Sequence, residues 1–497
     1  MNVCLFLAAF SLAAPFKDGA VLQRDRKVPV WGSAPAGSAV EVSFAGQTCR
    51  TVADADGAWR VDLAPMPASS VGHDLTVTSQ TSQTSQTLHD VLVGEVWFAS
   101  GQSNMACPIR GGDPHFSDVD GALVTQLVRR DDIRFVLTPE TWRVAPTNDV
   151  PVRWRKFSPE AFAGGGLKLS AVAWYFAREL NAALGVPVGI VDCAWGGSAI
   201  DAWIPREALA ARSDLKDIHD LPVKADWTWK DSYGPIVNNM MQPTVLWNAM
   251  VNPYAPYAMR GVIWYQGERN RAEPKKYVLK MHALYDGWSR KFENPGMSLY
   301  FVQLANFRYN WFGQWLAQAR FAAEESRAAM VVCSDLGAWD DIHPARKEPV
   351  ARRLAALTLK RDYGFDILAE SPIAAGWKVE GRRAVIEIRN GGERLHVHNE
   401  SVGDFSAPFE LAGQDGIFRP ARIVNFRMFK ENGKDRTFGG IPPDRIELEA
   451  EGVDMPVKVR YLFQKPRRSC VFNSAGLPLG AFQFGAPELE EFLKEEE

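Results

Sequence analysis

The spacing of apolar and polar residues divides the chain into three regions of different character. In residues 20–93, short runs such as "AVEVSFAGQ" and "GAWRVDLAP" alternate apolar and polar positions between Gly, Pro and Asp turns. The same alternation returns from about residue 372 to 485, in "RAVIEIRN" and "RIELEA". Such patterns are typical of half-buried strands joined by tight turns. We therefore expect a β domain on each side of the middle region.

The middle region has longer apolar runs, which we interpret as strands of a buried sheet. These runs are "EVWFAS", "VPVGIVDCAW", "MRGVIWYQ", "MSLYFVQLAN" and "MVVCSDLG", and helical patterns fall between them at 170–184, 275–291, 314–327 and 345–361. Strands that alternate with helices predict a parallel sheet covered on both faces. The predicted fold is α/β. An α/β domain at 94–370 would lie between an N-terminal β domain at 16–93 and a C-terminal, β-sandwich-like domain at 371–497.

The first residues, "MNVCLFLAAFSLAAP", have an apolar centre and an Ala-rich end. We expect residues 1–15 to be a signal peptide or its remnant, although the positive residues that usually begin one are missing. A buried first strand is the competing interpretation. A signal peptide would make the protein secreted or periplasmic, and no later run approaches the ~20 apolar residues of a membrane span.

Composition narrows the classes of function. The net charge of -3 and pI of about 6.3 leave no basic field for nucleic acid, so we expect no nucleic-acid partner. The six cysteines are scattered without a CxxC pair, which favours buried free thiols over a zinc site. Seventeen tryptophans suit carbohydrate contact, although packing accounts for most tryptophans in proteins. Nothing in the sequence indicates an oligomeric state.

Polar or Gly-rich clusters follow four of the predicted strands. They are "SGQSNM", "WGGSAIDAW", "WYQGERN" and "SDLGAWDDIHP". Each alone is compatible with an ordinary turn, because turns use the same residues. Ligands of open parallel sheets, however, bind at the carboxyl ends of the strands. Four such clusters at successive strand ends therefore predict a site.

Ser103 and His343 are the residues in these clusters that suit nucleophilic catalysis. A serine hydroxyl needs an adjacent base, and His343 alone among the eight histidines follows a sheet strand with carboxylates beside it. His343 would take the proton of Ser103 and later return it to a leaving alcohol. Asp341 and Asp340 both qualify as the carboxylate that orients the imidazole.

An oxyanion formed on Ser103 would need donors aimed at one point. The backbone N–H groups of Ser103 and Gly197 are candidates, and the side-chain amides of Gln266 and Asn270 are further ones. Gln102 is a candidate for substrate binding. Glu268 is a candidate for the same role, or for a salt bridge or a loop anchor. A plain tight turn remains the competing explanation for the two glycines at 196 and 197.

The four motifs together are similar to those of the sialate O-acetylesterase family of SGNH-type hydrolases. The similarity extends to "FKDGAVLQRDRKVPVWGSAPAGSAVEVSFAGQ", "LWNAMVNPYAPYAMRGVIWYQGE" and "SAGLPLGAFQF", and so covers nearly the whole chain. It implies a flavodoxin-like SGNH hydrolase domain with β accessory domains. It also implies Ser103 as nucleophile, His343 as base, no metal and no cofactor.

The resemblance implies that the substrate is an acetylated glycan, above all the 9-O-acetyl groups of sialic acids. In general SGNH hydrolases the acid would be Asp340, whereas the "DIHP" form of the sialate esterases favours Asp341. Arg269 stands where the family often has a small residue. A sialate pocket also needs a cation for the sugar carboxylate, for which Arg110, Arg269 and Arg308 are candidates.

Three other functions compete with this one. The same fold would serve an acetylxylan or other plant-glycan acetylesterase. The β domains and tryptophans would also suit a non-catalytic carbohydrate-binding protein. A metal-dependent deacetylase would have to use Asp113, His115, His396 or His398, whose spacings match no metal motif.

Overall fold

The computed structural model describes residues 10–81, 83–109, 130–158, 167–225, 239–397, 408–430, 437–463 and 468–485. The chain divides into two compact units. The first comprises Met1–Gln266 and Leu279–Leu299, and the second comprises Gly267–Val278 and Tyr300–Glu497. In the described ranges, no helix has both the length and the apolar character needed to cross a membrane.

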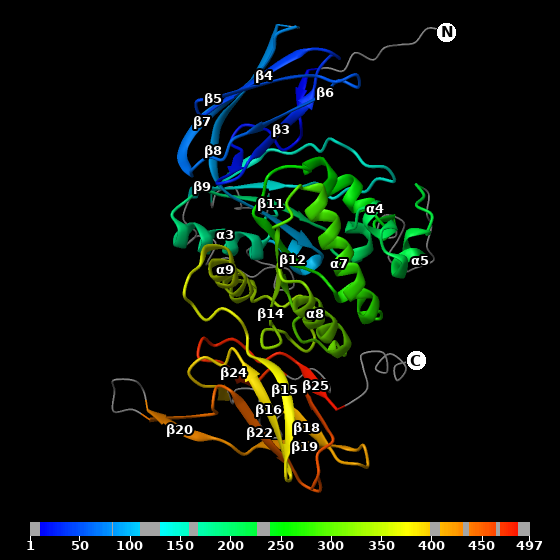
Figure 1. Cartoon of the computed structure of the whole chain (residues 1–497), viewed down its shortest axis with the longest axis vertical. Coiled ribbons are helices and arrows are strands. Elements are labelled where there is room, and N and C mark those ends of the chain that lie inside the picture. The colour runs from blue at the N-terminus through cyan, green and yellow to red at the C-terminus, as the bar shows by residue number, and fades with distance from the viewer. Residues whose placement is uncertain are drawn as a thin grey trace. The chain divides into compact units, whose positions relative to one another are not determined.

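The first unit begins with the expected β structure. One sheet has the order β1-β3-β6, and strands β4, β5 and β7 pair beside it in a second layer (Figure 1). Side chains in β4 and β6 alternate between buried and more exposed positions, as the period of two predicts. The bounds are β1 (Ser11–Leu12), β2 (Val21–Gln23), β3 (Val28–Ser33), β4 (Ala39–Phe44), β5 (Gln47–Val52), β6 (Ala58–Leu63) and β7 (Ser69–Ser79).

A single long strand, β8 (Thr84–Gly101), joins this β structure to the α/β sheet. Its first part pairs with β7, and its last residues pair with the strands of the α/β sheet. The boundary expected after residue 93 therefore falls inside a strand. The described residues of the polar repeat at 79–87 form the end of this hairpin, since Ser79 pairs with Thr84.

The α/β sheet of the first unit has the order β10-β9-β11-β8-β12. The strands are β9 (Arg130–Leu137), β10 (Trp154–Phe157), β11 (Val188–Ala194) and β12 (Gly261–Tyr265), and β9, β11, β8 and β12 run parallel. All residues of β11 and β12 are buried, as continuous apolar runs predict for a covered parallel sheet. The parallel sheet expected from the alternation of strands and helices is confirmed here.

Helix α3 (Ala171–Leu184) confirms the helix expected at 170–184. The Ser170 side chain accepts a hydrogen bond from the N–H of Ala173, and Gly185 ends the helix in the left-handed region. The unit also contains α1 (Ser103–Ala106), η3 (Ile200–Trp203), α4 (Arg206–Ala210), η4 (Ser213–Leu215), α5 (Lys216–His219), η5 (Trp247–Val251) and η6 (Asn252–Tyr254). Helix α7 (Pro274–Lys291) begins in the second unit and ends in the first.

The second unit contains the last α/β elements and the C-terminal β structure. Its α/β part holds η7 (Glu268–Asn270), α8 (Phe312–Glu324), β14 (Ala328–Val331) and α9 (Lys347–Tyr363), and β13 (Ser298–Val302) ends in it. The two helices lie within a few residues of the ranges expected at 314–327 and 345–361. Gly364 ends α9 in the left-handed region, as Gly185 ends α3.

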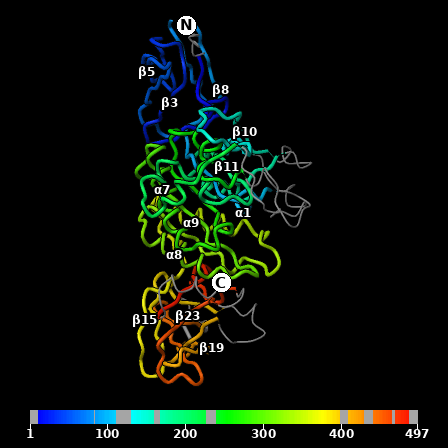
Figure 2. Tube along the Cα trace, turned by 90° about the vertical axis from the view of Figure 1, so that its right-hand side faces the viewer, coloured from blue at the N-terminus to red at the C-terminus, as the bar shows by residue number. Residues whose placement is uncertain are grey.

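The C-terminal strands form a seven-stranded antiparallel sheet in the order β15-β16-β22-β19-β18-β23-β25. Figure 2 shows β15, β19 and β23 in this sheet. Its strands are β15 (Ile373–Glu380), β16 (Arg383–Arg389), β18 (Phe409–Ala412), β19 (Phe418–Ile423), β22 (Arg445–Ala450), β23 (Lys458–Tyr461) and β25 (Phe482–Phe484). Two further pairs are β17 (His396–Val397) with β24 (Val471–Phe472), and β20 (Arg427–Lys430) with β21 (Thr437–Gly440). The expected β character is confirmed, and the sandwich arrangement stays a prediction.

Candidate active site

Ser103 opens the four-residue helix α1 directly after β8 ends at Gly101. The turn is held by the backbone of Gln102, whose N–H donates to the Tyr265 carbonyl (3.0 Å). The Gln102 carbonyl in turn accepts from the N–H groups of Met105 and Ala106 (2.9 Å each). Because these bonds tie α1 to the neighbouring strand, the partly exposed Ser103 has a fixed position at the strand end.

The turn at Gly196–Gly197 lies against Ser103. A Cβ added at Gly196 would lie 3.4 Å from the Cβ of Ser103, and the Trp195 N–H donates to the Gly101 carbonyl (3.1 Å). Gly197 has φ +75°, a conformation that residues with a Cβ rarely adopt. The ends of β8 and β11 are thus brought together, as the sheet rule predicted.

Gln266 follows β12 and supports the same turn from the other side. Its side chain is fully buried, and its Nε2 donates to the Ser198 carbonyl (3.2 Å). Within the first unit, Ser103, Gly197 and Gln266 therefore follow three strands that pair in the order β11-β8-β12. Gln102 is also buried at this edge of the sheet.

His343 lies in the second unit, in the irregular segment between β14 and α9. The Asp341 carboxylate accepts a hydrogen bond from the backbone N–H of His343 (2.7 Å). Asp341 thus shapes the backbone of the "DIHP" segment, whereas the side chain of Asp340 is exposed. Lys347, at the start of α9, is fully buried, and its Nζ donates to the Pro344 carbonyl (2.7 Å).

The pKa of His343 lies below the ordinary value for histidine. Burial is the main cause, because a low-dielectric environment disfavours the imidazolium. The positive charge of Lys347 lowers the pKa further, and the negative charge of Asp341 opposes both effects. The imidazole is therefore neutral over a wider pH range than that of an exposed histidine, which suits a group that accepts protons.

Glu268 and Asn270 lie in η7 of the second unit, directly after the buried Gly267. Both side chains are buried, and the Asn270 Nδ2 donates to the Glu273 carboxylate (2.6 Å). Gly267 has φ +150°, and a Cβ there would lie 3.0 Å from the amide nitrogen of Gln314 on α8. The close packing of η7 against α8 explains why this turn requires a glycine.

The second unit contains a group of aromatic and basic side chains. Of its members, only Arg308 was a candidate from the sequence. Tyr309 is 38% exposed and meets Phe307 edge to face, with ring centroids 4.9 Å apart. The guanidinium of Arg271 lies 4.6 Å from the Tyr309 ring centroid, and that of Arg308 lies 5.7 Å from it. The backbone N–H of Arg308 donates a hydrogen bond to the Trp339 carbonyl (3.1 Å). This bond connects the segment to the loop that carries His343.

Trp339 is the other exposed member of this group, with 57% of its surface accessible. Neither Arg271 nor Arg308 forms an ion pair with a carboxylate in the ranges that the structure describes. Unpaired guanidinium groups beside exposed rings can bind a ligand that has both a carboxylate and an apolar face. The signal in the sequence was "NFRYNWF", directly after the predicted strand "MSLYFVQLAN".

Several other predicted residues lie elsewhere. Arg110, Asp113, His115 and His398 fall outside the described residues. Among the residues that are described, no group of three His, Cys, Asp or Glu side chains could hold a metal ion. Cys107, Cys193, Cys333 and Cys470 are buried free thiols, as expected, and Cys49 is a half-buried one.

Comparison with solved structures defines the class of protein. A carbohydrate acetylesterase from Xanthomonas citri superposes with a TM-score of 0.78 at 30% sequence identity, and the alignment covers 95% of this chain and 99% of that one. That neighbour has an SGNH-type fold, and the present chain has further β-rich parts. Together with the strand-end site, the likeness defines a carboxylic ester hydrolase with acetylesterase activity.

Sequence comparison gives the family. The model of the carbohydrate esterase family of sialic acid-specific acetylesterases matches residues 93–359, which is more than half of the chain. Sialate O-acetylesterase of Rattus norvegicus is 29% identical over 392 residues, which cover 69% of this chain and 72% of the relative. The Homo sapiens protein of that name is 27% identical and covers 69% of each chain. The chain belongs to this carbohydrate esterase family, and an acetylated carbohydrate substrate fits it.

Proposed function

We propose that the chain removes O-acetyl groups from sugar hydroxyls, above all the 9-O-acetyl group of sialic acids, with Ser103 as nucleophile. The observation that carries the proposal is the close approach of the Gly196–Gly197 turn to Ser103. A Cβ added at Gly196 would lie 3.4 Å from the Cβ of Ser103. A glycine turn at this distance brings backbone N–H groups within reach of an acyl oxygen on Ser103. The family and its carbohydrate acetylesterase neighbour support the same chemistry.

The proposed reaction has two steps. In the first, the His343 imidazole takes the Ser103 proton while Oγ attacks the acetyl carbonyl carbon. The bond from this carbon to the sugar oxygen breaks, and the imidazolium gives its proton to that oxygen. In the second step, His343 takes a proton from water as the water attacks the acetyl-serine. Acetate leaves, and the proton returns to Oγ.

The oxyanion of each tetrahedral intermediate would be bound by the backbone N–H groups of Ser103 and Gly197. Gln266 would act by holding the turn through its bond to the Ser198 carbonyl, and the side-chain amide of Asn270 is the further candidate donor. We assign the orienting acid to Asp341 rather than Asp340. Its carboxylate accepts a hydrogen bond from the backbone N–H of His343, and its charge raises the pKa of this histidine against the effect of burial.

Two arginines support a sialate as the sugar rather than a xylan. Xylose carries no carboxylate, whereas sialic acid does, and Arg271 and Arg308 have no carboxylate partner among the described residues. Tyr309 and Trp339 would contact the apolar face of the sugar. Arg269 is also exposed, but it lies in η7 and is not one of the arginines beside Tyr309. Arg110 lies outside the described residues.

The first experiment tests the chemistry. Ser103→Ala and His343→Ala should each lower the turnover of para-nitrophenyl acetate by about a thousandfold or more, because the nucleophile and the base act as one unit. Circular dichroism would confirm that both variants are folded. Wild-type turnover by folded Ser103→Ala would refute the proposal and favour a different nucleophile, whereas no turnover by the wild type itself would favour a non-catalytic role.

The second experiment tests the substrate. Acetate release should be compared between a 9-O-acetylated sialoglycan and acetylated xylan. Arg271→Gln and Arg308→Gln should raise KM for the sialoglycan about tenfold and leave xylan and para-nitrophenyl acetate unchanged. Arg320→Gln is the matched control, because Arg320 is exposed on α8 and pairs with Glu324 instead. Faster release from xylan by the wild type would favour the plant-glycan alternative.

We also propose a flavodoxin-like order for the whole catalytic sheet and export of the protein. The order β11-β8-β12 supports the first: once β9 and β10 at the edge are set aside, the next strand after β8 lies on one side of it and the following strand on the other. The apolar first residues support export. Because Ser11 pairs with Ser33, cleavage that keeps β1 must fall before Ser11. If N-terminal sequencing showed that the exported protein begins at residue 16, cleavage before Ser11 would be contradicted.

A further inference from the structure

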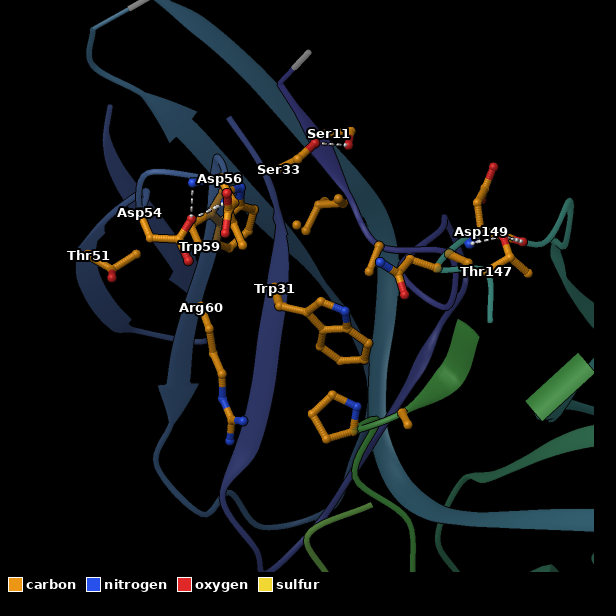
Figure 3. A pocket seen from close by; sticks show the side chains of 18 of the residues that line it. Ser11, Trp31, Ser33, Thr51, Asp54, Asp56, Trp59, Arg60, Thr147 and Asp149 are labelled. Atoms are coloured by element: carbon orange, nitrogen blue, oxygen red, sulfur yellow. Dashed lines mark hydrogen bonds between the residues drawn. The ribbon is translucent and has the colours of Figure 1, made fainter. Parts of the chain in front are cut away.

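We propose that a pocket in the N-terminal part of the first unit is a second, non-catalytic binding site for a neutral oligosaccharide. The pocket has a volume of about 1180 Å³ and shares no lining residue with the strand-end clusters. It lies between β1, β3, the turn that connects β5 to β6 and the segments around residues 148 and 256 (Figure 3). The inference goes beyond the proposed function and does not require it.

Trp31 provides an aromatic surface in this pocket. Its side chain is half-buried and projects from β3 among the lining residues (Figure 3). The ring of the fully buried Phe16 holds it edge to face, with centroids 5.0 Å apart and planes at 81°. No side-chain hydrogen bond joins the Trp31 indole N–H to the described part of the chain. A fixed indole with an unused donor suits a sugar, which has an apolar face and many hydroxyl oxygens.

Short polar side chains surround this ring. Ser11 and Ser33 share a hydrogen bond (2.9 Å) on one wall. On the other wall, Asn252 donates to the Thr147 carbonyl (2.8 Å) and fixes the segment that carries the exposed Asn148. Hydroxyl and amide groups on rigid segments can exchange hydrogen bonds with sugar hydroxyls at little entropic cost.

The charges in the pocket are largely paired within the protein. Arg60 binds Glu293 through two hydrogen bonds (2.6 and 2.7 Å) and Asp62 through a third (2.9 Å). Lys291 pairs with Glu207, and Asp54 accepts hydrogen bonds from two backbone N–H groups of its own turn. The charged side chains that remain are Lys17, Asp56 and Asp149. Because they do not form a cluster of one sign, an uncharged ligand is favoured over an ionic one.

The size of the pocket favours an oligosaccharide over a monosaccharide. Pockets for single drug-sized ligands have volumes of roughly 300–1,000 Å³. At about 1180 Å³, this pocket exceeds that range and has room for several sugar residues. A site of this kind would hold a glycan chain while its acetyl groups are removed elsewhere on the enzyme.

Calorimetric titration of the full chain with unacetylated xylohexaose, cellohexaose and mannohexaose tests the inference. At least one of them should bind, and Trp31→Ala should weaken that binding about tenfold, whereas Trp31→Phe should weaken it less. Asn148→Trp, which fills the pocket from the opposite wall, should abolish binding even if Trp31→Ala fails to fold. Phe426→Ala removes an exposed ring (57%) from the C-terminal β structure and should bind like the wild type.

The inference is overturned if no neutral hexaose binds, if only hexagalacturonic acid binds, or if Asn148→Trp and folded Trp31→Ala bind like the wild type. Because the probes carry no acetyl group, their binding does not depend on Ser103. Hexaose binding by a chain with no esterase activity would sink the proposed function alone. Normal turnover of para-nitrophenyl acetate with no hexaose binding would sink this inference alone.

Discussion

The surroundings of Ser103 and of His343 are built in different ways. Ser103 follows a buried parallel strand, and the bonds that fix its turn run between backbone groups of adjacent strands. His343 lies in an irregular segment after the short strand β14, and side chains shape its surroundings. The Asp341 carboxylate accepts a hydrogen bond from the backbone N–H of His343, and the buried Lys347 donates one to the Pro344 carbonyl.

This contrast indicates a division of labour between geometry and electrostatics. Backbone pairing in a sheet fixes positions closely but offers few means to tune charge. Side chains around a loop can raise or lower a pKa without moving the sheet. We therefore expect substitutions near Ser103 to act on position and stability, and substitutions near His343 to act on the pH dependence of catalysis.

Among the substitutions that test this contrast, a methyl group at Gly101 should have the largest effect. This residue has φ +141°, and a Cβ there would lie 2.1 Å from the Tyr265 carbonyl oxygen on the paired strand β12. Gly101→Ala must separate the strands or shift the turn, so kcat should fall about a hundredfold or more. Steady-state kinetics with para-nitrophenyl acetate measures this loss.

Gly185→Ala is the matched control for that experiment. Gly185 also has a positive φ of +65°, but an added Cβ would meet nothing within 4 Å. It should cost about 1 kcal/mol in the free energy of unfolding, because of the left-handed conformation, and leave kcat close to the wild-type value. Equal losses of kcat in the two variants would contradict the geometric role of the strand end.

Asp192 on β11 gives a smaller effect, which concerns stability. Burial raises the pKa of Asp192 to about 7. The hydrogen bond that its carboxylate accepts from the Ser170 N–H (2.8 Å) lowers this pKa, and the negative charge of Glu140 raises it. A pKa that is raised in the folded state stabilises the fold below the unfolded pKa, and this stabilisation is lost as pH rises through the folded pKa. For Asp192, this stabilisation is therefore lost over the pH range from 3.8 to about 7.

The wild type should therefore lose up to roughly 3 kcal/mol of unfolding free energy between pH 5 and pH 8 through this group. Asp192→Asn keeps an acceptor for Ser170 and removes the titration, so its stability should depend less on pH. Urea unfolding at both pH values, with the wild type alongside, measures the difference. The same pH dependence in both proteins would remove Asp192 as its source.

Local signals in the sequence were sufficient for some elements. Ser170 and Gly185 mark the two ends of α3, because each acts through a backbone group next to it. The strand-end position of Ser103 also followed from pattern alone, since a buried parallel strand reads as an apolar run that stops at a polar turn.

Features that depend on distant partners could not be predicted. Arg134 is buried in β9, a strand that the sequence analysis did not identify, because the charges in "RDDIRFVL" mask the apolar run. It is held by the Gly19 carbonyl (2.9 Å) and the Asp90 carboxylate (3.0 Å), both far away in sequence. The group around Tyr309 was missed for a similar reason, because its arginines come from two separate segments.

The smallest expected effect is a shift in the acid limb of the pH profile of kcat/KM, and it tests the second half of the contrast. A protonated imidazole cannot take the Ser103 proton, so activity should fall as pH falls through the pKa of His343. Because burial and Lys347 lower this pKa, the wild type should stay active at lower pH than an ordinary histidine would allow.

Two substitutions should move this acid limb in opposite directions. Lys347→Gln removes a positive charge and keeps a donor for the Pro344 carbonyl, so the pKa of His343 should rise and the limb should move to higher pH. Asp341→Asn removes a negative charge and keeps an acceptor for the His343 N–H, so the limb should move to lower pH. Asp340→Asn, at an exposed side chain, should leave the profile unchanged. Shifts of the same sign in the first two variants would mean that loop geometry, rather than charge, sets the pKa of His343. The contrast with the strand end at Ser103 would then fail.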